Sequence, residues 1–477
     1  MNRQHARPIM VQGTMSGAGK SLLCAALCRI FARQGLRVAP FKSQNMALNS
    51  CVTDDGLEMG RAQAVQAAAA GKRPDVRMNP VLLKPCTDTG SQVIVNGIAR
   101  SEMGAAEYYE KKASLIPDVL AAYHSLAEEN DVIVIEGAGS PAEINLREND
   151  FVNMGLASMV DAPVLLAGDI DRGGVFAQLV GTAALLEPEE TARIKGFLIN
   201  KFRGDPAILQ HGLDLLEQRT GIPVLGVIPY LDVDIDEEDS LAPRLAAGTE
   251  GVLDVAVIRF PRISNFTDLA PLEAHPQFGV RYVERVQDLG SPDLIILPGT
   301  KSTTPELLWM RESGLEAKVL QCASRGTPVI GICGGFQMLG RTVEEEGPSV
   351  RGLGLLPVDT VFQPDKKLVR TETTVRDCPF LDGALNGLAI SGYEIHQGRT
   401  SDGIHATDTV LGSYLHGFFD RGDLVEALAD ALSKKKGVSY VGAQPVSHAE
   451  YLDTQLNILA DGVEAACNME AIWELIQ

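Results

Sequence analysis

The chain has 477 residues, too many for one hydrophobic core, and this length predicts two or three domains. Hydrophobic residues make up 45% of the chain and aromatic residues only 5%, which is typical of α/β proteins with parallel strands. The formal net charge of -20 repels phosphate backbones and anionic lipids, so we expect neither a nucleic acid nor a membrane as a partner.

The N-terminal stretch MNRQHARPIMVQG has a polar start and a short apolar strand that soon reaches a glycine. This pattern does not match a signal peptide and predicts a cytoplasmic protein. The eight cysteines form no CxxC pair and no regular spacing, which argues against a disulfide framework or a zinc site.

Six short apolar runs alternate with helix-like segments in the first half of the chain, a pattern that predicts a doubly wound parallel sheet. The runs are residues 8–13, 37–42, 131–139, 162–169, 194–202 and 223–230. This first domain is expected to span residues 1–230. The next stretch, 231–250, is rich in acidic residues, glycine and proline and is interpreted as a linker.

A second α/β series follows the linker and predicts a second domain over residues 251–435. Its expected strands are residues 253–260, 293–300, 327–335, 388–398 and 409–417. From about Asp420 the pattern is mostly helical, so residues 436–477 are expected to form a C-terminal helical extension.

The stretch GTMSGAGKS, residues 13–21, lies between an apolar strand and a helix-like run, which is the setting of a phosphate-binding loop. In the usual spacing the first glycine stands where this chain has Thr14, and the variant resembles the loop of dethiobiotin synthetases. The expected ATP contacts here are Gly13, Thr14, Gly17, Gly19, Lys20 and Ser21. The Ser21 hydroxyl is expected to bind Mg²⁺ as well.

Two more charged residues end predicted strands at the edge of the sheet where ligands bind. Glu136, in VIVIEGAGS, is the expected second Mg²⁺ ligand. Lys42, in APFKSQN, is expected to neutralise the charge of a transferred phosphoryl group, although a solvated lysine is the alternative.

The stretch VIGICGGFQMLG, residues 329–340, places Cys333 between glycines where a strand gives way to a helix. This matches a nucleophile elbow with cysteine as the nucleophile, the Gly334 N–H being one oxyanion donor. His416 also follows a strand and is the favoured general base, and Gly299 in LPGTKST is the second oxyanion donor. His396 is the alternative base.

With these residues assembled, the second half resembles class I (triad) glutamine amidotransferases, and the whole chain resembles the cobyric acid synthase family. The supporting stretches include PFKSQNMALNS, EGAGSPAEINL, GDIDRGGVFAQLVGT, SNFTDLAPL, GICGGFQMLG and YLHGFF. The implied fold is an N-terminal P-loop domain like dethiobiotin synthetase, with a doubly wound parallel sheet, followed by an amidotransferase-like α/β domain.

The resemblance implies a ligase that uses glutamine, ATP and Mg²⁺ to amidate the b, d, e and g carboxylates of adenosylcobyrinic acid a,c-diamide, giving adenosylcobyric acid. An acyl phosphate and a glutamyl group on Cys333 are the expected intermediates. Triad amidotransferases usually carry His-x-Glu, but the residue two after His416 is Phe418. The group that orients His416 is therefore open between Glu394, Asp420 and others. The sequence is also compatible with a homo-oligomer.

Further contacts follow from the resemblance. Asn200, in LINKFRGD, is expected to hold the adenine together with its neighbour Lys201. The amide side chains of Gln44, Asn45, Asn49 and Asn145 are candidates for hydrogen bonds to the arms of the corrin, with loop capping as the alternative.

Two other functions are left open. Cobyrinic acid a,c-diamide synthase shares the two-domain logic but amidates other carboxylates. A P-loop ATPase of the partition type with a non-catalytic amidotransferase-like module is the second alternative.

Overall fold

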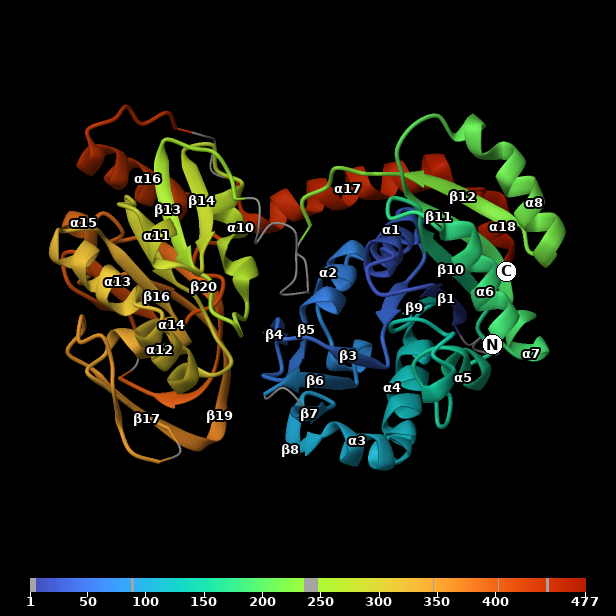
Figure 1. The fold of residues 1–477 in the computed structure, drawn as a ribbon, viewed down its shortest axis with the longest axis horizontal. Helices are drawn as coiled ribbons and strands as arrows, with labels where there is room; N and C mark the ends of the chain where they lie inside the picture. Colours follow the sequence, from blue (N-terminus) through green and yellow to red (C-terminus); the bar gives the residue numbers. More distant parts are fainter. Residues whose placement is uncertain (1–5, 87–89, 236–247, 346, 402, 443–445) are drawn as a thin grey trace. The chain divides into compact units, whose positions relative to one another are not determined.

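The computed structural model describes residues 6–86, 90–235, 248–345, 347–401, 403–442 and 446–477 (Figure 1). The chain forms two compact units, and each is assembled from segments that are separate in the sequence. Unit 1 contains Met1–Met46, Glu58–Ile235 and Leu452–Gln477, and unit 2 contains Ala47–Leu57 and Asp236–Tyr451.

Unit 1 is built on a six-stranded parallel sheet, which confirms the predicted doubly wound architecture. Its strands, in spatial order, are β12 (Val224–Pro229), β11 (Ile194–Phe202), β10 (Val164–Asp169), β1 (Arg7–Gly13), β9 (Val132–Glu136) and β2 (Val38–Phe41). They coincide with the six apolar runs of the first half. Every residue of β9 and β10 is buried, as expected for parallel strands covered on both faces.

Helices connect these strands and begin where the apolar period changes from two to about 3.6 residues. They are α1 (Lys20–Arg33), α2 (Arg61–Ala69), α4 (Ile116–Glu129), α5 (Met154–Met159), α6 (Val175–Leu185), α7 (Pro188–Thr191) and α8 (Gln210–Thr220). Short β5 (Glu58–Gly60) leads into α2.

Unit 1 also contains a four-stranded sheet that the sequence analysis did not predict. Its spatial order is β3 (Gln44–Met46), β6 (Val81–Pro85), β7 (Gly90–Val95) and β8 (Ile98–Gly104), with α3 (Ala105–Lys111) directly after it. The two-residue turn between β7 and β8 is Asn96-Gly97, and both residues have positive φ, 48° and 79°. Asn-Gly between apolar runs is a strong hairpin signal, so this part of the sheet was readable from the sequence.

The C-terminal helices α17 (His448–Ala466) and α18 (Met469–Glu474) confirm the helical prediction for this part of the chain. They do not form a separate extension. Leu456, Leu459, Val463 and Ile472 are buried in the same hydrophobic cluster as Ile9 of β1 and several residues of α1. Burial of this apolar face explains why Leu452–Gln477 belongs to unit 1.

Unit 2 is built on a second sheet whose main strands are parallel, as predicted. Its spatial order is β14 (Phe278–Val283), β13 (Leu253–Ile258), β15 (Leu294–Leu297), β16 (Val329–Ile332), β22 (Val410–Ser413) and the antiparallel β21 (His405–Ala406). The sequence analysis missed β14. Its FGVRYV stretch is short and carries Arg281 in its centre, whose guanidinium reaches Asp254.

The predicted strand at residues 388–398 exists as β20 (Ala389–Arg399), but it lies in another sheet. β20 pairs antiparallel with the long β19 (Asp359–Thr374). On the other side of β19 lie β17 (Thr342–Glu344) and then β18 (Val350–Arg351). The helices of unit 2 are α10 (Ala270–Glu273), α11 (Val286–Leu289), α12 (Thr303–Glu312), α13 (Leu315–Ser324), α14 (Gly334–Leu339), α15 (Phe380–Gly383) and α16 (Gly422–Lys436).

The division of the chain differs from the expected contiguous domains at three places. The short segment Ala47–Leu57, which contains β4 (Ser50–Val52), belongs to unit 2. The C-terminal helices belong to unit 1. Most of the expected linker, residues 236–247, lies outside the described residues, while Ile235 before it is buried in the core of unit 1.

In the part of the chain that the structure describes, no helix is both long and apolar enough to cross a lipid bilayer.

Candidate active sites

The predicted phosphate loop connects β1 to α1 in unit 1. Gly17 and Gly19 have φ values of 77° and 89°, which favour glycine over any residue with a side chain. A Cβ on Gly19 would lie 2.1 Å from Nδ2 of Asn200, so this glycine also makes room for the neighbouring strand end. The loop conformation therefore depends on glycine at both positions.

Thr14 is held by protein groups on both sides. Its N–H donates to the Ala167 carbonyl at 2.9 Å, and its hydroxyl donates to Oε1 of Gln178 at 3.0 Å. A Cβ on Gly13 would lie 3.1 Å from atoms of Ala18 and Lys20, so the loop folds back closely over this residue. Gly13 and Thr14 thus fix the start of the loop against β10 and α6.

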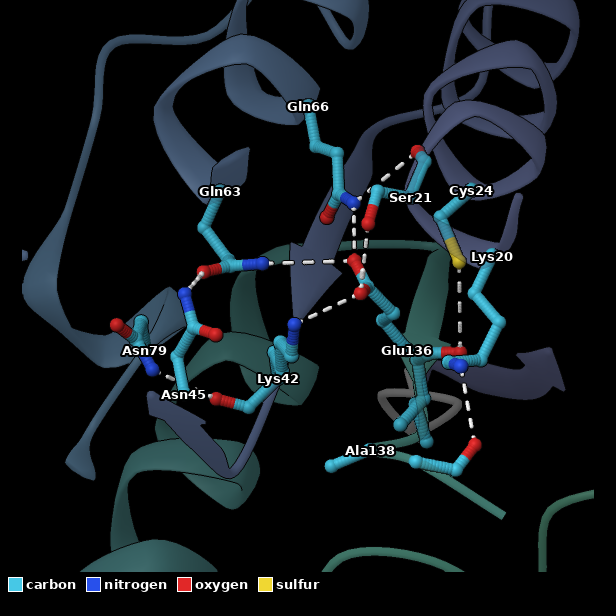
Figure 2. A network of polar contacts seen from close by, with 12 residues as sticks. Lys20, Ser21, Cys24, Lys42, Asn45, Gln63, Gln66, Asn79, Glu136 and Ala138 are labelled. Carbon is cyan, nitrogen blue, oxygen red and sulfur yellow. Dashed lines mark hydrogen bonds and ion pairs between the residues drawn. The ribbon is translucent and has the colours of Figure 1, made fainter. Parts of the chain in front are cut away.

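The Glu136 carboxylate is the centre of a buried polar cluster at the end of β9. Figure 2 shows the side chains of Lys42, Ser21 and Gln66 converging on it. Oε1 of Glu136 lies 2.8 Å from Nζ of Lys42 and accepts a hydrogen bond from the Ser21 hydroxyl at 2.9 Å. Gln66 donates to Oε2 at 2.6 Å, and the longer contact from Gln63 is 3.5 Å.

The charge state of this cluster follows from its contacts. Burial by itself raises the pKa of the Glu136 carboxyl, but Lys42 and the hydrogen bonds from Gln66 and Ser21 outweigh it, and the pKa is lowered. Glu136 is therefore an anion although only 1% of it is exposed. It is the kind of hard oxygen ligand that divalent cations prefer.

Lys20 is the first residue of α1, and its side chain contacts two loops. Its Nζ donates to the carbonyl of Met15 at 3.1 Å and to the carbonyl of Gly139, in the loop after β9, at 3.0 Å. Burial, partly offset by Glu136, lowers the pKa of Lys20. The ammonium group thus lies between the phosphate loop and the loop that follows Glu136.

Asn200 and Lys201 end β11 beside the same loop. Asn200 donates to the Ala18 carbonyl at 3.0 Å, and Lys201 donates to the Gly17 carbonyl at 2.7 Å. Lys201 also forms an ion pair of 2.9 Å with Asp169, a buried residue at the end of β10 that the sequence analysis did not single out. A carboxylate at the end of an apolar strand was the signal for it.

The donor set at Glu136 fits a Mg²⁺ ion. The Ser21 hydroxyl and the Glu136 carboxylate are adjacent oxygen groups, and Mg²⁺ commonly binds one or two such groups together with phosphates and water. Within the described residues, the buried Oε1 of Gln66 has no hydrogen-bond partner, so this cluster contains an acceptor that a metal-bound water would satisfy.

The four residues with amide side chains that were candidates for contacts to the corrin arms lie in different environments. Gln44 is half-buried and accepts a hydrogen bond from the Tyr108 hydroxyl. Asn45 is buried and donates to Gln63 at 3.0 Å, within the cluster around Glu136. Asn145 is exposed, with its carbonyl 3.4 Å from the Tyr109 hydroxyl. Asn49 belongs to unit 2.

Cys333 lies between β16 and α14 in unit 2, at the turn that the sequence predicts. Its φ of 49° and ψ of -106° are strained for a residue with a side chain, as in nucleophile elbows. A Cβ on Gly335 would lie 1.9 Å from the Leu297 carbonyl oxygen, so glycine is required for the helix to start this close to β15. Cys333 is 7% exposed and lies at the helix N-terminus.

His416 is buried, and the electrostatic effects of Asp268 and Cys333 both act on its pKa. Its Nδ1 lies 2.7 Å from Oδ2 of Asp268, whose other oxygen accepts from the Gly417 N–H at 2.9 Å. Burial lowers the pKa of His416, but Asp268 and Cys333 outweigh it and raise the pKa to about 10. His416 is therefore protonated at neutral pH.

Asp268 is the functional residue that the sequence reasoning missed. It lies in the 3₁₀ turn Phe266–Leu269, inside the stretch SNFTDLAPL, and is 148 residues from His416 along the chain. It completes a Cys333–His416–Asp268 arrangement in which the carboxylate fixes the imidazole tautomer.

Asp268 lies against Nδ1 of His416, so this position is not held by either of the other two carboxylates considered for it. Glu394 pairs with Lys367 at 2.8 Å and lies 3.2 Å from Nε2 of His396. Asp420 follows Gly417, and its N–H donates to the Gly417 carbonyl. His396, the alternative base, stacks on Tyr414 with ring centroids 3.6 Å apart, and its Nδ1 is 2.6 Å from the Gly398 carbonyl.

The two glycines expected to form the oxyanion hole lie next to this arrangement. A Cβ on Gly299 would be 3.0 Å from Cε1 of His416, and a Cβ on Gly334 would be 3.1 Å from the Thr300 nitrogen. The loop after β15 and the elbow after β16 are therefore in contact, with His416 beside them.

The segment Ala47–Leu57 reaches the surroundings of His416. Oδ1 of Asn49 accepts from the Asn265 N–H at 2.6 Å, and the Asn265 side chain donates to the Ser50 carbonyl at 3.0 Å and to the Tyr393 hydroxyl at 2.7 Å. The Tyr393 ring stacks on His416 with centroids 5.4 Å apart. Asn49 is thus a structural partner of unit 2.

Comparisons with known proteins identify one family in each half of the chain. Residues 9–241 match the family described as CobQ/CobB/MinD/ParA nucleotide binding domain, and residues 254–424 match the CobB/CobQ-like glutamine amidotransferase domain. The cobyric acid synthase of Ruminiclostridium cellulolyticum is 51% identical over 99% of this chain and 97% of its own.

The chain belongs to the cobyric acid synthase family. The enzyme of Lachnoclostridium phytofermentans is 49% identical over 99% of both chains, and that of Yersinia enterocolitica is 49% identical over 98% of both. A solved glutamine amidotransferase covers 39% of this chain at 18% identity with a TM-score of 0.29. As a cobyric acid synthase family member with an amidotransferase domain, the protein is a glutamine-dependent ligase.

Proposed function

We propose that the protein amidates the b, d, e and g carboxylates of adenosylcobyrinic acid a,c-diamide, with glutamine as nitrogen donor and ATP as activator. The observation that carries this proposal is that one chain holds both a buried Cys333–His416–Asp268 arrangement and a phosphate loop beside the Glu136 cluster. The Cys333–His416–Asp268 arrangement suits the release of ammonia, the nucleophile, from glutamine. The phosphate loop and the Glu136 cluster suit the activation of a carboxylate by ATP.

In unit 2, Sγ of Cys333 attacks the amide carbon of glutamine, and His416 gives its proton to the departing ammonia. Water then cleaves the thioester to release glutamate. The N–H groups of Gly299 and Gly334 are the proposed donors to the tetrahedral oxyanion. Asp268 holds the imidazole in the tautomer that these proton transfers need.

In unit 1, an acceptor carboxylate oxygen attacks the γ-phosphorus of ATP, and ADP leaves. Ammonia then attacks the acyl carbon, and phosphate leaves with the C–O bond electrons, so each amide costs one ATP. Lys20 and Lys42 neutralise the charge of the transferred group. Mg²⁺ would be held by Ser21 and Glu136 and would supply further charge neutralisation.

The remaining contacts proposed for ATP are the loop residues from Gly13 to Gly19 and Asn200. The Asn200 side chain bonds to the loop itself, through the Ala18 carbonyl, which supports a place at the edge of the nucleotide site. The proposed location is the cytoplasm, where glutamine and ATP are supplied and free thiols such as Cys333 stay reduced.

A mass spectrum of the corrinoid product tests the proposal. The protein is incubated with adenosylcobyrinic acid a,c-diamide, glutamine, ATP and Mg²⁺, and each change from carboxylate to amide lowers the mass by about one unit, as replacing OH by NH₂ requires. Four successive steps support the proposal. No change, with glutamate still released from glutamine, refutes the acceptor.

Amidation of cobyrinic acid itself at a and c would instead indicate cobyrinic acid a,c-diamide synthase. A protein that cleaves ATP but releases no glutamate from glutamine would indicate a non-catalytic amidotransferase module.

A further inference from the structure

Unit 1 contains a cavity of about 400 Å³ beside the four-stranded sheet. The four-stranded sheet supplies one part of its lining, and α3 and the loop before α5 supply the rest. Most of the lining is apolar. Its apolar side chains include Leu83, Val93, Met103 and Phe151.

The chain connects this cavity directly to the Glu136 cluster. Gln44, which lines the cavity, is two residues beyond Lys42, and two residues of extended chain span about 7 Å. On the other side, Val152 lines the cavity and the next residue, Asn153, donates to the Ala138 carbonyl at 2.6 Å, in the loop after Glu136. Two walls of the cavity thus begin at the proposed site of phosphoryl transfer.

The rim of the cavity is open and apolar. Met46 is 61% exposed and Leu146 is 49% exposed, and both are lining residues. Nζ of Lys112 lies 4.2 Å from the centre of the Tyr109 ring, so a cation is held at the cavity wall. A ligand with an apolar body, larger than the cavity and carrying anionic arms, matches these features.

We propose that this cavity and its rim bind one edge of the corrin ring of the acceptor, with a carboxylate arm directed to the Glu136 cluster. The inference rests on the proposed function and adds where the acceptor binds. Apolar contact has little directional preference. The cavity therefore suits an enzyme that has to present four carboxylates of one ring in turn, because the ring can be seated in several rotational positions.

The test measures binding of adenosylcobyrinic acid a,c-diamide by equilibrium dialysis, read from corrin absorbance. Leu146→Glu and Met103→Glu each place a carboxylate on the lining, and neither residue is fully buried, so the fold should persist. We expect the dissociation constant to rise tenfold or more, the order expected for losing one buried aliphatic contact. Leu215→Glu, on an aliphatic residue that is 49% exposed like Leu146 and lies outside the lining, is the matched control.

Unchanged corrinoid binding in both lining variants, in a wild-type protein that amidates, would overturn the cavity assignment and leave the function intact. A wild-type protein that binds no corrinoid would overturn both, so the two failures are distinguishable. Release of glutamate from glutamine should be equal in all variants, because the substitutions lie outside unit 2.

A second inference rests on the separate observation that Ala47–Leu57 belongs to unit 2 while the residues before and after it belong to unit 1. Asn265, which Asn49 holds through its backbone N–H, has a φ of 52° and starts the 3₁₀ turn that carries Asp268. The Asn265 carbonyl accepts from the Asp268 N–H at 3.0 Å. Asn49 therefore contacts Asn265, whose carbonyl helps to position Asp268, the partner of His416.

Both ends of the segment are anchored in unit 1. Asn45 belongs to the cluster around Glu136 through Gln63, and Glu58 forms a buried ion pair of 2.9 Å with Lys84. We infer that Asn49 is a positioning residue for His416.

The test uses Asn49→Ala, with Asn49→Asp as the variant that keeps the acceptor oxygen. We expect Asn49→Ala to lower the kcat for glutamate release about tenfold, the effect of one lost buried hydrogen bond, and to leave the KM for glutamine nearly unchanged. Asn49→Asp should restore most of the rate. Amidation with added ammonia should be retained in both.

Asp54→Ala is the matched control, because Asp54 lies on the same segment and forms an exposed ion pair with Arg370. A wild-type kcat and pH profile in folded Asn49→Ala would overturn the positioning role. Equal loss of the ammonia-dependent reaction would also overturn it, since that result would mean a general structural role.

Discussion

Replacing Asp268 by asparagine tests the mechanism at the residue on which it most depends. The carboxylate receives two hydrogen bonds, from Nδ1 of His416 at 2.7 Å and from the Gly417 N–H at 2.9 Å. Asparagine keeps one oxygen, but its NH₂ group would face either the ring or the backbone N–H. The imidazole then loses its charged partner and the tautomer that the carboxylate fixes.

The expected loss follows from the hydrogen bond to the imidazolium. A hydrogen bond to a charged group contributes about 1.5–3 kcal/mol, which corresponds to about 10- to 150-fold in rate. The assay is glutamate release from glutamine under saturating conditions. Ammonia-dependent amidation by the same variant is the internal control and should be nearly unchanged.

The pH dependence gives a second readout. The pKa of His416 is raised to about 10, so the imidazolium persists well above neutral pH in the wild type. In Asp268→Asn the alkaline limb of the rate profile should move to lower pH. The raised pKa of His416 stabilises the folded wild-type protein. This contribution is complete below about pH 6.5 and is lost as the pH rises through 10. The difference in unfolding free energy between the two proteins should therefore shrink over that range.

A variant that releases glutamate within twofold of the wild-type rate, with the same alkaline limb, would refute the role assigned to Asp268.

Four further outcomes are expected. Cys333→Ala should abolish glutamine use but keep ammonia-dependent amidation, measured by corrinoid mass, and loss of both in a folded protein would contradict the division of labour. Lys20→Ala should remove amidation while sparing glutamate release, and amidation at the wild-type rate would mean that the loop is not the ATP site. Gly19→Ala should weaken ATP binding, measured by calorimetry, because its Cβ would meet Asn200 at 2.1 Å; unchanged affinity would contradict the loop geometry. Leu459→Ala should lower the unfolding free energy of unit 1 by about 2–5 kcal/mol in urea, since this side chain is only 2% exposed, and a negligible change would contradict its place in the core.

The elements that the sequence predicted well are those whose signals are local. The six parallel strands of unit 1 are continuous apolar runs, and the turns at Gly19 and Cys333 are marked by glycines within a few residues. Each could be predicted without knowing what lies across the fold.

The features that the sequence did not predict depend on distant pairings. Asp268 meets His416 across 148 residues, and nothing in SNFTDLAPL marks that aspartate as different from a residue in a turn. Asn49 lies in a polar stretch next to Lys42, so its neighbours in sequence suggested the phosphate edge, whereas its side chain holds Asn265. In both cases long-range packing overrides the local pattern.

The path of the chain limits how this enzyme could be divided. A cut between the two halves, giving residues 1–235 and 248–477 as separate polypeptides, would leave the first piece without the helices that cover its core near Ile9. The second piece would lack the strand that carries Ser50, whose carbonyl accepts from Tyr393 beside His416. Each piece would keep its reactive side chains but lose some of the residues that pack against them or bond to their neighbours. A two-gene version of this protein would therefore need to exchange both segments, or replace them, before either half could work alone.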